Sequence, residues 1–308
     1  MELRNLHTFL AVAEALSFTR AANSLGYAQS TVTAQIQALE HELGVPVFER
    51  LGKRVLLTAA GERLQAYARR LTQLEEELMV AVPGVTEPAG TLRVGSPQSV
   101  CAYRLPALLK RFRERYPQVK LVIQSGSNAE LCSAVAEGSL DVTFFMGPSS
   151  QADALVVEVL RVEPIRVVAL PNHRLARKRE VQPQDLADEM ILHTEHDSAY
   201  RIMFDQDLLA AGVTPQVAVE FSAIEAVKQC ALAGMGLAVL PEMAVAQELE
   251  ARRLVALAWH DRDFEVLTQM ALHKQKWLSP ALVAFTETVR SYVGSAPKAR
   301  SRPRPSRA

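Results

Sequence analysis

The spacing of apolar residues divides the chain into two parts with different periods. In residues 1–60 apolar side chains recur every three or four positions, which predicts short amphipathic helices. Ser17 is placed to cap the second helix, and Gly26 to end it. A third helix is predicted from about Gln29 to Leu43, where Gly44 stops it. Its apolar stripe consists of Val32, Ile36, Leu39 and Leu43.

A small hairpin and a long helix are predicted to follow. The segment "VFERLGKRVLLT" holds two β-prone runs around Gly52, which is typical of a hairpin. From Gly61 to about Val82 an apolar pattern repeats every seven residues. The repeating positions are Leu64, Leu71 and Leu78, with Tyr67, Leu74 and Ala81 between them. This pattern favours a helix that packs on a second copy of itself, and the alternative is a helix packed on its own domain.

After the linker "PGVTEPAG" short apolar runs alternate with helical patterns, which predicts an α/β architecture. Strands are expected at 91–95, 119–123, 140–145, 156–160, 165–170, 190–192, 217–221, 237–240 and 267–272. Helices are expected at 105–115, 128–137, 200–211, 224–233 and 281–292. Open α/β sheets bind ligands beyond the carboxyl ends of their strands. The loops "SPQSV", "SGSN", "FMGP" and "HTEHDSAY" are therefore the predicted ligand-binding segments.

Composition narrows the class of protein. The formal net charge is zero, so no overall field draws the chain to nucleic acid or membrane, and any polyanion binding must come from local placement. No stretch reaches the roughly 18 apolar residues of a membrane span, and the N-terminus lacks the features of a signal peptide. Cys101, Cys132 and Cys230 lie far apart, which argues against a disulfide framework or a metal cluster. We expect a cytoplasmic protein with no membrane partner, no metal and no cofactor.

The outward face of the third helix carries groups suited to reading DNA bases. This face is formed by Gln29, Ser30, Thr31, Thr33, Ala34 and Gln37. Glutamine can pair with adenine, hydroxyls can bond bases or phosphates, and small side chains let a helix approach the major groove closely. Residues suited to phosphate contact flank it, namely Thr19, Arg20, Arg50, Lys53 and Arg54. The pattern fits a helix-turn-helix that binds double-stranded DNA, and the alternative is a helical domain with a merely polar surface.

These segments resemble a known family. The run "LHTFLAVAEALSFTRAANSLGYAQSTVTAQIQALEHELGVPVFERLGKRVLLTAAGE" resembles the N-terminal domain of LysR-type transcriptional regulators. The runs "LPALLKRFRERYPQVKLVI", "LCSAVAEGSLDVTF" and "AVKQCALAGMGLAVLP" resemble the effector-domain segments of that family. The resemblance implies an α+β multidomain fold: a winged helix-turn-helix over 1–60, a dimerising linker helix and hinge over 61–89, and a two-lobed α/β effector domain of periplasmic-binding-protein type over 90–293. It also implies a homodimer through the linker helix, a homotetramer, a small-molecule effector and no catalytic site. RNA polymerase is a further candidate partner.

The resemblance assigns roles to individual positions. Gln29, Ser30 and Thr33 match positions that read bases, whereas Ala34 stands where relatives often carry an arginine, which leaves more of the binding to Arg20 and the hairpin.

In the effector domain, Ser99 and Ser127 match positions that bind a polar group of the effector. The other expected effector contacts are Gln98, Asn128, Ser198 and Phe221. The alternative for each hydroxyl is a helix cap. Met146 stands where relatives that respond to aromatic acids carry an arginine. We therefore expect an effector that is weakly charged or is held by hydroxyls and backbone N–H groups.

Other classes of function compete with this interpretation. A transport protein or enzyme of the same fold class would need a signal peptide or an active site, and no nucleophile–base pair is visible. In "HTEHD", His193 and His196 would hold a metal only if the loop folded suitably, and a solvated loop is expected instead. Ser198 stands where the peroxide-sensing branch of the family carries its reactive cysteine, and Cys230 is expected to be a small buried hydrophobe. The Pro-, Ser- and Arg-rich tail over 294–308 is expected to be disordered and basic.

Overall fold

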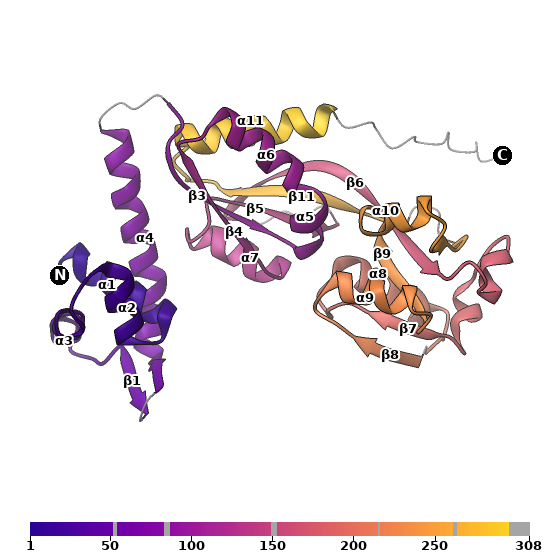
Figure 1. Cartoon of the computed structure of the whole chain (residues 1–308), viewed down its shortest axis with the longest axis horizontal. Coiled ribbons are helices and arrows are strands. Elements are labelled where there is room, and N and C mark those ends of the chain that lie inside the picture. The colour runs from indigo at the N-terminus through magenta and orange to yellow at the C-terminus, as the bar shows by residue number, and fades with distance from the viewer. Residues whose placement is uncertain (52–53, 83–86, 149–152, 215, 261–263, 296–308) are drawn as a thin grey trace.

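A computed structural model describes residues 1–308 apart from 52–53, 83–86, 149–152, 215, 261–263 and 296–308. Figure 1 shows a helical N-terminal domain, one long helix and an α/β unit with two lobes. The N-terminal domain consists of α1 (Leu3–Ala15), α2 (Phe18–Leu25), α3 (Gln29–Leu43), β1 (Phe48–Leu51) and β2 (Arg54–Leu57).

The three N-terminal helices enclose a single apolar core. The Ser17 hydroxyl accepts a hydrogen bond from the Arg20 N–H at 3.3 Å and caps α2, as predicted. Gly26 ends α2 with φ +68°, a left-handed conformation that glycine adopts without strain. The predicted apolar stripe of α3 is confirmed for Val32, Ile36 and Leu39, which are fully buried. Leu43 is 40% exposed, because the last turn of α3 extends beyond the core.

The hairpin is attached to α3 by one carboxylate. Strands β1 and β2 pair in antiparallel fashion, which confirms the predicted wing. Glu40 Oε1 accepts the backbone N–H groups of Val47 at 2.8 Å and Phe48 at 3.3 Å. A carboxylate that accepts two backbone N–H groups holds the start of the wing firmly, so the wing and α3 form one unit.

The long helix α4 (Ala59–Ala81) begins two residues before the predicted start. The reason is Thr58, whose hydroxyl accepts the Gly61 N–H at 3.0 Å and acts as the N-cap. One side of α4 packs on the N-terminal core through the fully buried Ala68. Its other side leaves large apolar side chains exposed, namely Tyr67, Leu71, Leu74, Leu78 and Met79.

Lobe 1 is a mixed sheet in the order β4-β3-β5-β11-β6. Its strands are β3 (Gly90–Ser96), β4 (Val119–Ser125), β5 (Val142–Gly147), β6 (Leu155–Ala169) and β11 (Glu265–His273). Its helices are α5 (Gln98–Tyr103), α6 (Leu105–Arg115), α7 (Asn128–Ala136) and α11 (Pro280–Ser295). Strand β11, which comes from the end of the chain, lies between β5 and β6 and pairs antiparallel with both.

Lobe 2 continues the same sheet through β6. Its further strands are β7 (Met190–His193), β8 (Gln216–Glu220), β9 (Leu237–Pro241) and β10 (Val255–Ala256). Its helices are α8 (Ala199–Ala210), α9 (Ile224–Leu232), α10 (Glu242–Glu250), and the short 3-10 helices η1 (Arg174–Arg177) and η2 (Pro183–Leu186). The first part of β6 pairs with β11 and its last part with β9, so one strand belongs to both lobes (Figure 1).

Several element predictions are wrong in detail. The expected strands 156–160 and 165–170 are one strand, β6, because polar residues interrupt the apolar run without ending the ladder. Among them Glu163 is fully buried and is satisfied by the Arg104 guanidinium at 2.9 and 2.6 Å. Helices α5 and α10 and strand β10 were not predicted. Helix α11 includes residues 294–295, the start of the predicted tail, and 296–308 lie outside the described residues. No helix in the described part of the chain has the length and apolar character of a membrane span.

Candidate functional site

Helix α3 presents a polar face away from the core of the N-terminal domain. The side chains of Gln29, Ser30, Thr31 and Gln37 are exposed, and Thr33 is half-buried. They lie opposite the buried stripe because an α-helix places residues three or four positions apart on one face. No lysine or arginine occurs in α3. Its outward face can therefore donate and accept hydrogen bonds but carries no positive charge.

The polar face is partly pre-oriented by contacts with α2. The Thr19 hydroxyl donates to Gln29 Oε1 at 3.1 Å, which joins two of the predicted residues across the turn. The Thr33 hydroxyl donates to the Gln29 carbonyl at 2.9 Å. The Arg20 guanidinium donates to the Ala15 carbonyl at the end of α1, so it is tethered while it remains exposed. These contacts limit the rotamers of the groups that a ligand would meet.

The basic residues of the wing lie on both of its strands. Arg50 is on β1, and Arg54 is on β2 with its side chain exposed. Lys53 lies outside the described residues. Tyr27, which is 42% exposed between α2 and α3, is a further large side chain beside the polar face. Pattern analysis missed it because a single aromatic residue after a helix-ending glycine has no periodicity.

A cleft of about 560 Å³ lies between the two lobes. Lobe 1 contributes the loop after β3, the end of β4, the start of α7 and the end of β5. Lobe 2 contributes the loop after β7 and the loop between β8 and α9. The predicted segments "SPQSV", "SGSN" and "HTEHDSAY" all reach this cleft, as does Met146 of "FMGP". The carboxyl ends of the strands are thus brought together, as expected for an open α/β sheet.

Six of the seven predicted effector residues line the cleft: Gln98, Ser99, Ser127, Asn128, Met146 and Ser198. Several of them are already occupied by contacts within the protein. The Asn128 amide donates to the Met146 carbonyl at 2.6 Å and accepts the Met146 N–H at 3.2 Å. Asn128 therefore fastens α7 to β5. The Ser127 hydroxyl caps α7 in a reciprocal pair with Glu130, so the alternative of a helix cap is correct for Ser127.

The two lobes touch along one side of the cleft. Gln98 Oε1 accepts the Ile224 N–H at 2.9 Å, and the Tyr103 hydroxyl donates to Glu225 at 2.7 Å. The Lys228 ammonium lies 5.4 Å from the centre of the Tyr103 ring, within range of a cation–π contact. These contacts join α5 to the start of α9. Gln98 is therefore a contact between lobes as well as a cleft residue.

The expectation that Phe221 forms a wall of the cleft is wrong. Its ring packs against the apolar cluster of lobe 2, and its N–H donates to the His193 carbonyl at 3.0 Å. The neighbouring Ser222 lines the cleft instead. Alternate residues of an extended segment face opposite sides, so an error of one position exchanges the apolar side for the polar one.

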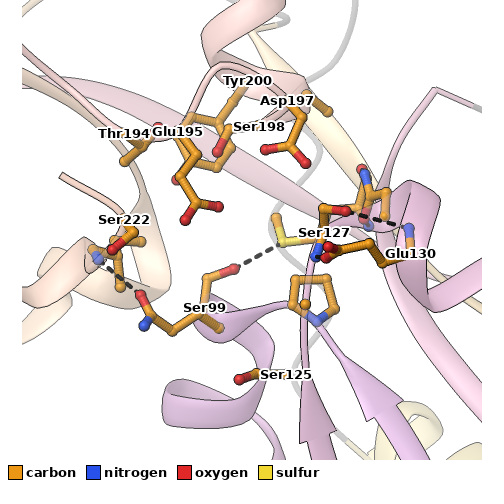
Figure 2. A pocket seen from close by; sticks show the side chains of 17 residues that line it. Ser99, Ser125, Ser127, Glu130, Thr194, Glu195, Asp197, Ser198, Tyr200 and Ser222 are labelled. Carbon is orange, nitrogen blue, oxygen red and sulfur yellow. Dashed lines mark hydrogen bonds between the residues drawn. The ribbon is translucent and has the colours of Figure 1, made fainter. Parts of the chain in front are cut away.

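Sequence reasoning missed the acidic residues of the cleft. Glu130, Glu195 and Asp197 line it, together with the hydroxyls of Ser125, Thr194, Tyr200 and Ser222. Figure 2 shows the Glu195 and Asp197 carboxylates directed from lobe 2 toward Ser99 and Ser127 of lobe 1. Burial and the neighbouring carboxylates Asp197, Glu130 and Glu220 raise the pKa of Glu195. Glu195 and Asp197 belong to "HTEHD", a segment that was weighed only as a metal ligand set, and Glu130 lies in the first turn of α7.

The histidines of "HTEHD" do not converge. His193 is 4% exposed at the end of β7, and burial lowers its pKa. His196 is exposed, and its Nε2 lies 3.6 Å from Glu220. In the part of the chain that the structure describes, no three His, Cys, Asp or Glu side chains are grouped to hold a metal ion. Cys230 is half-buried against the lobe 2 core rather than fully buried.

Two family models match the chain. Residues 3–62 match the model described as bacterial regulatory helix-turn-helix protein, lysR family. Residues 86–294 match the LysR substrate binding domain. The boundary between the two matches falls in α4 and the segment after it.

Full-length relatives align with nearly the whole chain. The chain is 43% identical over 94% of its length to the uncharacterized HTH-type transcriptional regulator YwqM of Bacillus subtilis (strain 168), of which it covers 99%. It is 33% identical to the RuBisCO operon transcriptional regulator of Allochromatium vinosum, with 94% of the chain and 96% of the relative covered. Among solved structures, CbnR, a LysR family transcriptional regulator, aligns over 95% of the chain and 99% of its own with a TM-score of 0.69 at 23% identity. Full-length OxyR from Pseudomonas aeruginosa aligns over 94% and 98% with a TM-score of 0.71 at 25% identity.

Proposed function

Because the chain belongs to the LysR family of bacterial helix-turn-helix transcriptional regulators, we propose that α3 reads base edges in the major groove of its operator. The observation that carries this assignment is the exposed polar face of α3 beside the wing. Gln29, Ser30, Thr31, Thr33 and Gln37 are the proposed base-reading residues. Thr19, Arg20, Arg50, Lys53 and Arg54 are the proposed phosphate contacts, which position the helix without reading sequence.

The remaining parts of the chain have proposed roles in regulation. Residues 1–60 bind DNA, 61–89 form the dimerising helix and hinge, and 90–293 bind the effector. The exposed apolar row of α4 supports a dimer through this helix, and a pair of such dimers gives a homotetramer. Two recognition helices then reach successive major grooves of one operator. The protein acts in the cytoplasm, where its DNA lies.

The cleft between the lobes is the proposed effector site. Ser99 and Ser198 are the predicted hydroxyls that do not cap a helix: the Ser99 hydroxyl donates to the Met146 sulfur at 3.2 Å, and the Ser198 hydroxyl bonds the Tyr200 side chain. An effector that contacts both lobes would stabilise one relative orientation of the lobes over others. Such a ligand shifts the population of states in proportion to its differential affinity, and thereby changes how the assembly holds DNA.

The groove assignment predicts that Gln29→Ala and Thr33→Ala each lower operator affinity by about tenfold, since a good base contact contributes roughly 1–3 kcal/mol of discrimination. The measurement is a gel shift with full-length protein and the DNA upstream of its own gene, at one fixed salt concentration, because affinity for DNA depends steeply on salt.

His41→Ala is the matched control, because His41 is exposed on the last turn of the same helix, away from the proposed contacts. It should keep the affinity of the unmodified protein. If both Gln29→Ala and Thr33→Ala also kept that affinity, α3 would not be the base-reading element.

A further inference from the structure

All charged side chains that line the cleft are acidic. Glu195 and Asp197 belong to the loop after β7, and Glu130 to the first turn of α7. No lysine, arginine or histidine is among the described residues that line it. Two basic side chains close to this loop in sequence face other carboxylates: the Arg201 guanidinium pairs with Asp205 and Glu220, and His196 Nε2 lies 3.6 Å from Glu220. In the described chain, neither Glu195 nor Asp197 has a basic partner within ion-pair distance.

The helix N-termini at the cleft do not offset these charges. In α7 the Ser127 N–H donates to Glu130 at 2.9 Å, and the Glu130 N–H donates to the Ser127 hydroxyl at 3.2 Å. In α9 the first N–H is taken by Gln98. The N-termini of α5 and α8 also reach the cleft and have no side-chain cap, and each carries about half a positive charge or less, whereas each of the three carboxylates carries a full negative charge. An anionic ligand would meet net repulsion in this cleft.

Hydrogen-bonding groups surround the carboxylates on both sides of the cleft. The hydroxyls of Ser99, Ser125, Ser198 and Ser222 line it (Figure 2). Thr194 is 5% exposed and also lines it; its hydroxyl neighbours that of Tyr200, yet no hydrogen bond of good geometry reaches it. Hydroxyls can accept hydrogen bonds from an ammonium or guanidinium group and can donate to other polar groups of the same ligand.

We propose that the effector is a small polar cation, whose ammonium or guanidinium group lies between Glu195, Asp197 and Glu130 while its other polar groups bond the surrounding serines. This inference rests on the proposed role of the cleft as the effector site. The sequence predicted a weakly charged effector, whereas this proposal is an effector with a positive charge. The volume of about 560 Å³ accommodates a ligand of metabolite size with accompanying water.

The test compares ligands of matched shape and different charge. The first set is 1,4-diaminobutane, butane-1,4-diol and succinate, and the second is glucosamine, glucose and glucuronate. Thermal shift and calorimetry on the full chain, at concentrations up to ~10 mM, report binding because a ligand that binds the folded state raises Tm. We expect at least one of the two cations to bind more tightly than the neutral and anionic members of its set, and to lose affinity as salt screens the carboxylates.

Two variants locate the site. Glu195→Gln and Asp197→Asn should each weaken cation binding about tenfold, as expected for loss of a charge-assisted hydrogen bond. Asp188→Asn is the control, because Asp188 is an exposed carboxylate of the same lobe that does not line the cleft. The proposal is overturned if neither cation binds, if the neutral or anionic members bind as well as the cations, or if the control variant loses as much affinity as the cleft variants. Operator binding measured on the same preparations separates the two ideas: intact DNA binding without a cation response contradicts the ligand class alone, whereas absent DNA binding contradicts the regulatory function.

Discussion

The carboxylate of Glu195 lies in a setting that disfavours its charge. Burial acts on it first, and three carboxylates add repulsion, namely those of Asp197, Glu130 and Glu220. Both effects raise its pKa above the ordinary value of 4.5. A group whose pKa is higher in the folded state than in the unfolded state favours folding when it is protonated. As the pH rises through the raised pKa, this contribution to the free energy of unfolding is lost. At neutral pH the ionised Glu195 therefore lowers the stability of the ligand-free protein.

Glu195→Gln is therefore expected to raise the Tm of the ligand-free protein at pH 7, by a small amount because the exposed Glu195 side chain is screened by solvent. The gain should disappear when the pH falls below 4.5, because Glu195 is then protonated in both states. Thermal melts of both proteins across this pH range measure the difference. Asp188→Asn, away from the cleft, should show no such gain, and a Glu195→Gln variant that is less stable at pH 7 would contradict the argument.

At the residue scale, the sequence predicts positions better than roles. Resemblance to relatives predicted that Ser99, Ser127 and Ser198 lie together, and all three line one cleft between the lobes. It could not reveal that Asn128 is occupied by the Met146 backbone or that Gln98 bonds Ile224, because those partners are distant in sequence. The three carboxylates were also missed as a group, since their proximity depends on how the two lobes meet.

Among the elements, the first turn of α4 packs closely against the chain that leads into the wing. A Cβ at Gly61 would lie 2.1 Å from the Val47 carbonyl oxygen, which is backbone and has little freedom to move. Gly61→Ala should therefore destabilise the N-terminal domain by about 1–3 kcal/mol, the usual cost of overpacking. Differential scanning calorimetry of the full chain would detect this as a lower Tm for the unfolding transition of the N-terminal domain.

Gly147→Ala is the matched control for Gly61→Ala. A Cβ there would meet the Ala199 Cβ at 3.7 Å, which is an ordinary van der Waals contact, so the calorimetric transitions should stay nearly unchanged. Equal melting of Gly61→Ala and the unmodified protein would show that α4 can shift away from the wing without cost.

The helices of the N-terminal domain were predictable because each has an apolar stripe of period 3.6, and because serine or glycine marks an end of α2 and of α3. The pattern of apolar residues predicted two strands in place of β6. It did so because Arg161 and Glu163 are charged and interrupt the apolar run. The buried Glu163 is tolerated in a strand because Arg104 reaches it from the junction of α5 and α6 and the Arg161 guanidinium lies 3.3 Å from it. The local sequence pattern does not reveal that a side chain distant in sequence pairs with a buried charge. A strand that contains such a charge is therefore predicted as two strands.

In the whole molecule, one feature of the described residues is a row of exposed large apolar side chains along α4. Leu74 is 60% exposed, and Leu78 is 57% exposed one helical turn later. Leu74→Glu should lower the mass of the assembly in analytical ultracentrifugation, because a buried charge at a helix–helix interface has no partner there. The variant should still fold, since Leu74 lines an open pocket between α4 and lobe 1 and is not part of a buried core. Arg69→Glu, exposed on α4 outside the apolar row, should leave the assembly intact. If Leu74→Glu kept the full mass, the contact between copies would lie elsewhere.

The position of β11 has a consequence for how the chain folds as it leaves the ribosome. Lobe 1 needs β11 between β5 and β6, yet β11 is synthesised only after all the strands of lobe 2. Lobe 2 can therefore complete its own strand pairing first. During this time the edge of β5 that will pair with β11 is unpaired. Unpaired strand edges in a nascent chain invite association with other chains. Slow or interrupted translation between residues 150 and 265 is thus expected to favour aggregation of this protein more than an interruption in the N-terminal domain.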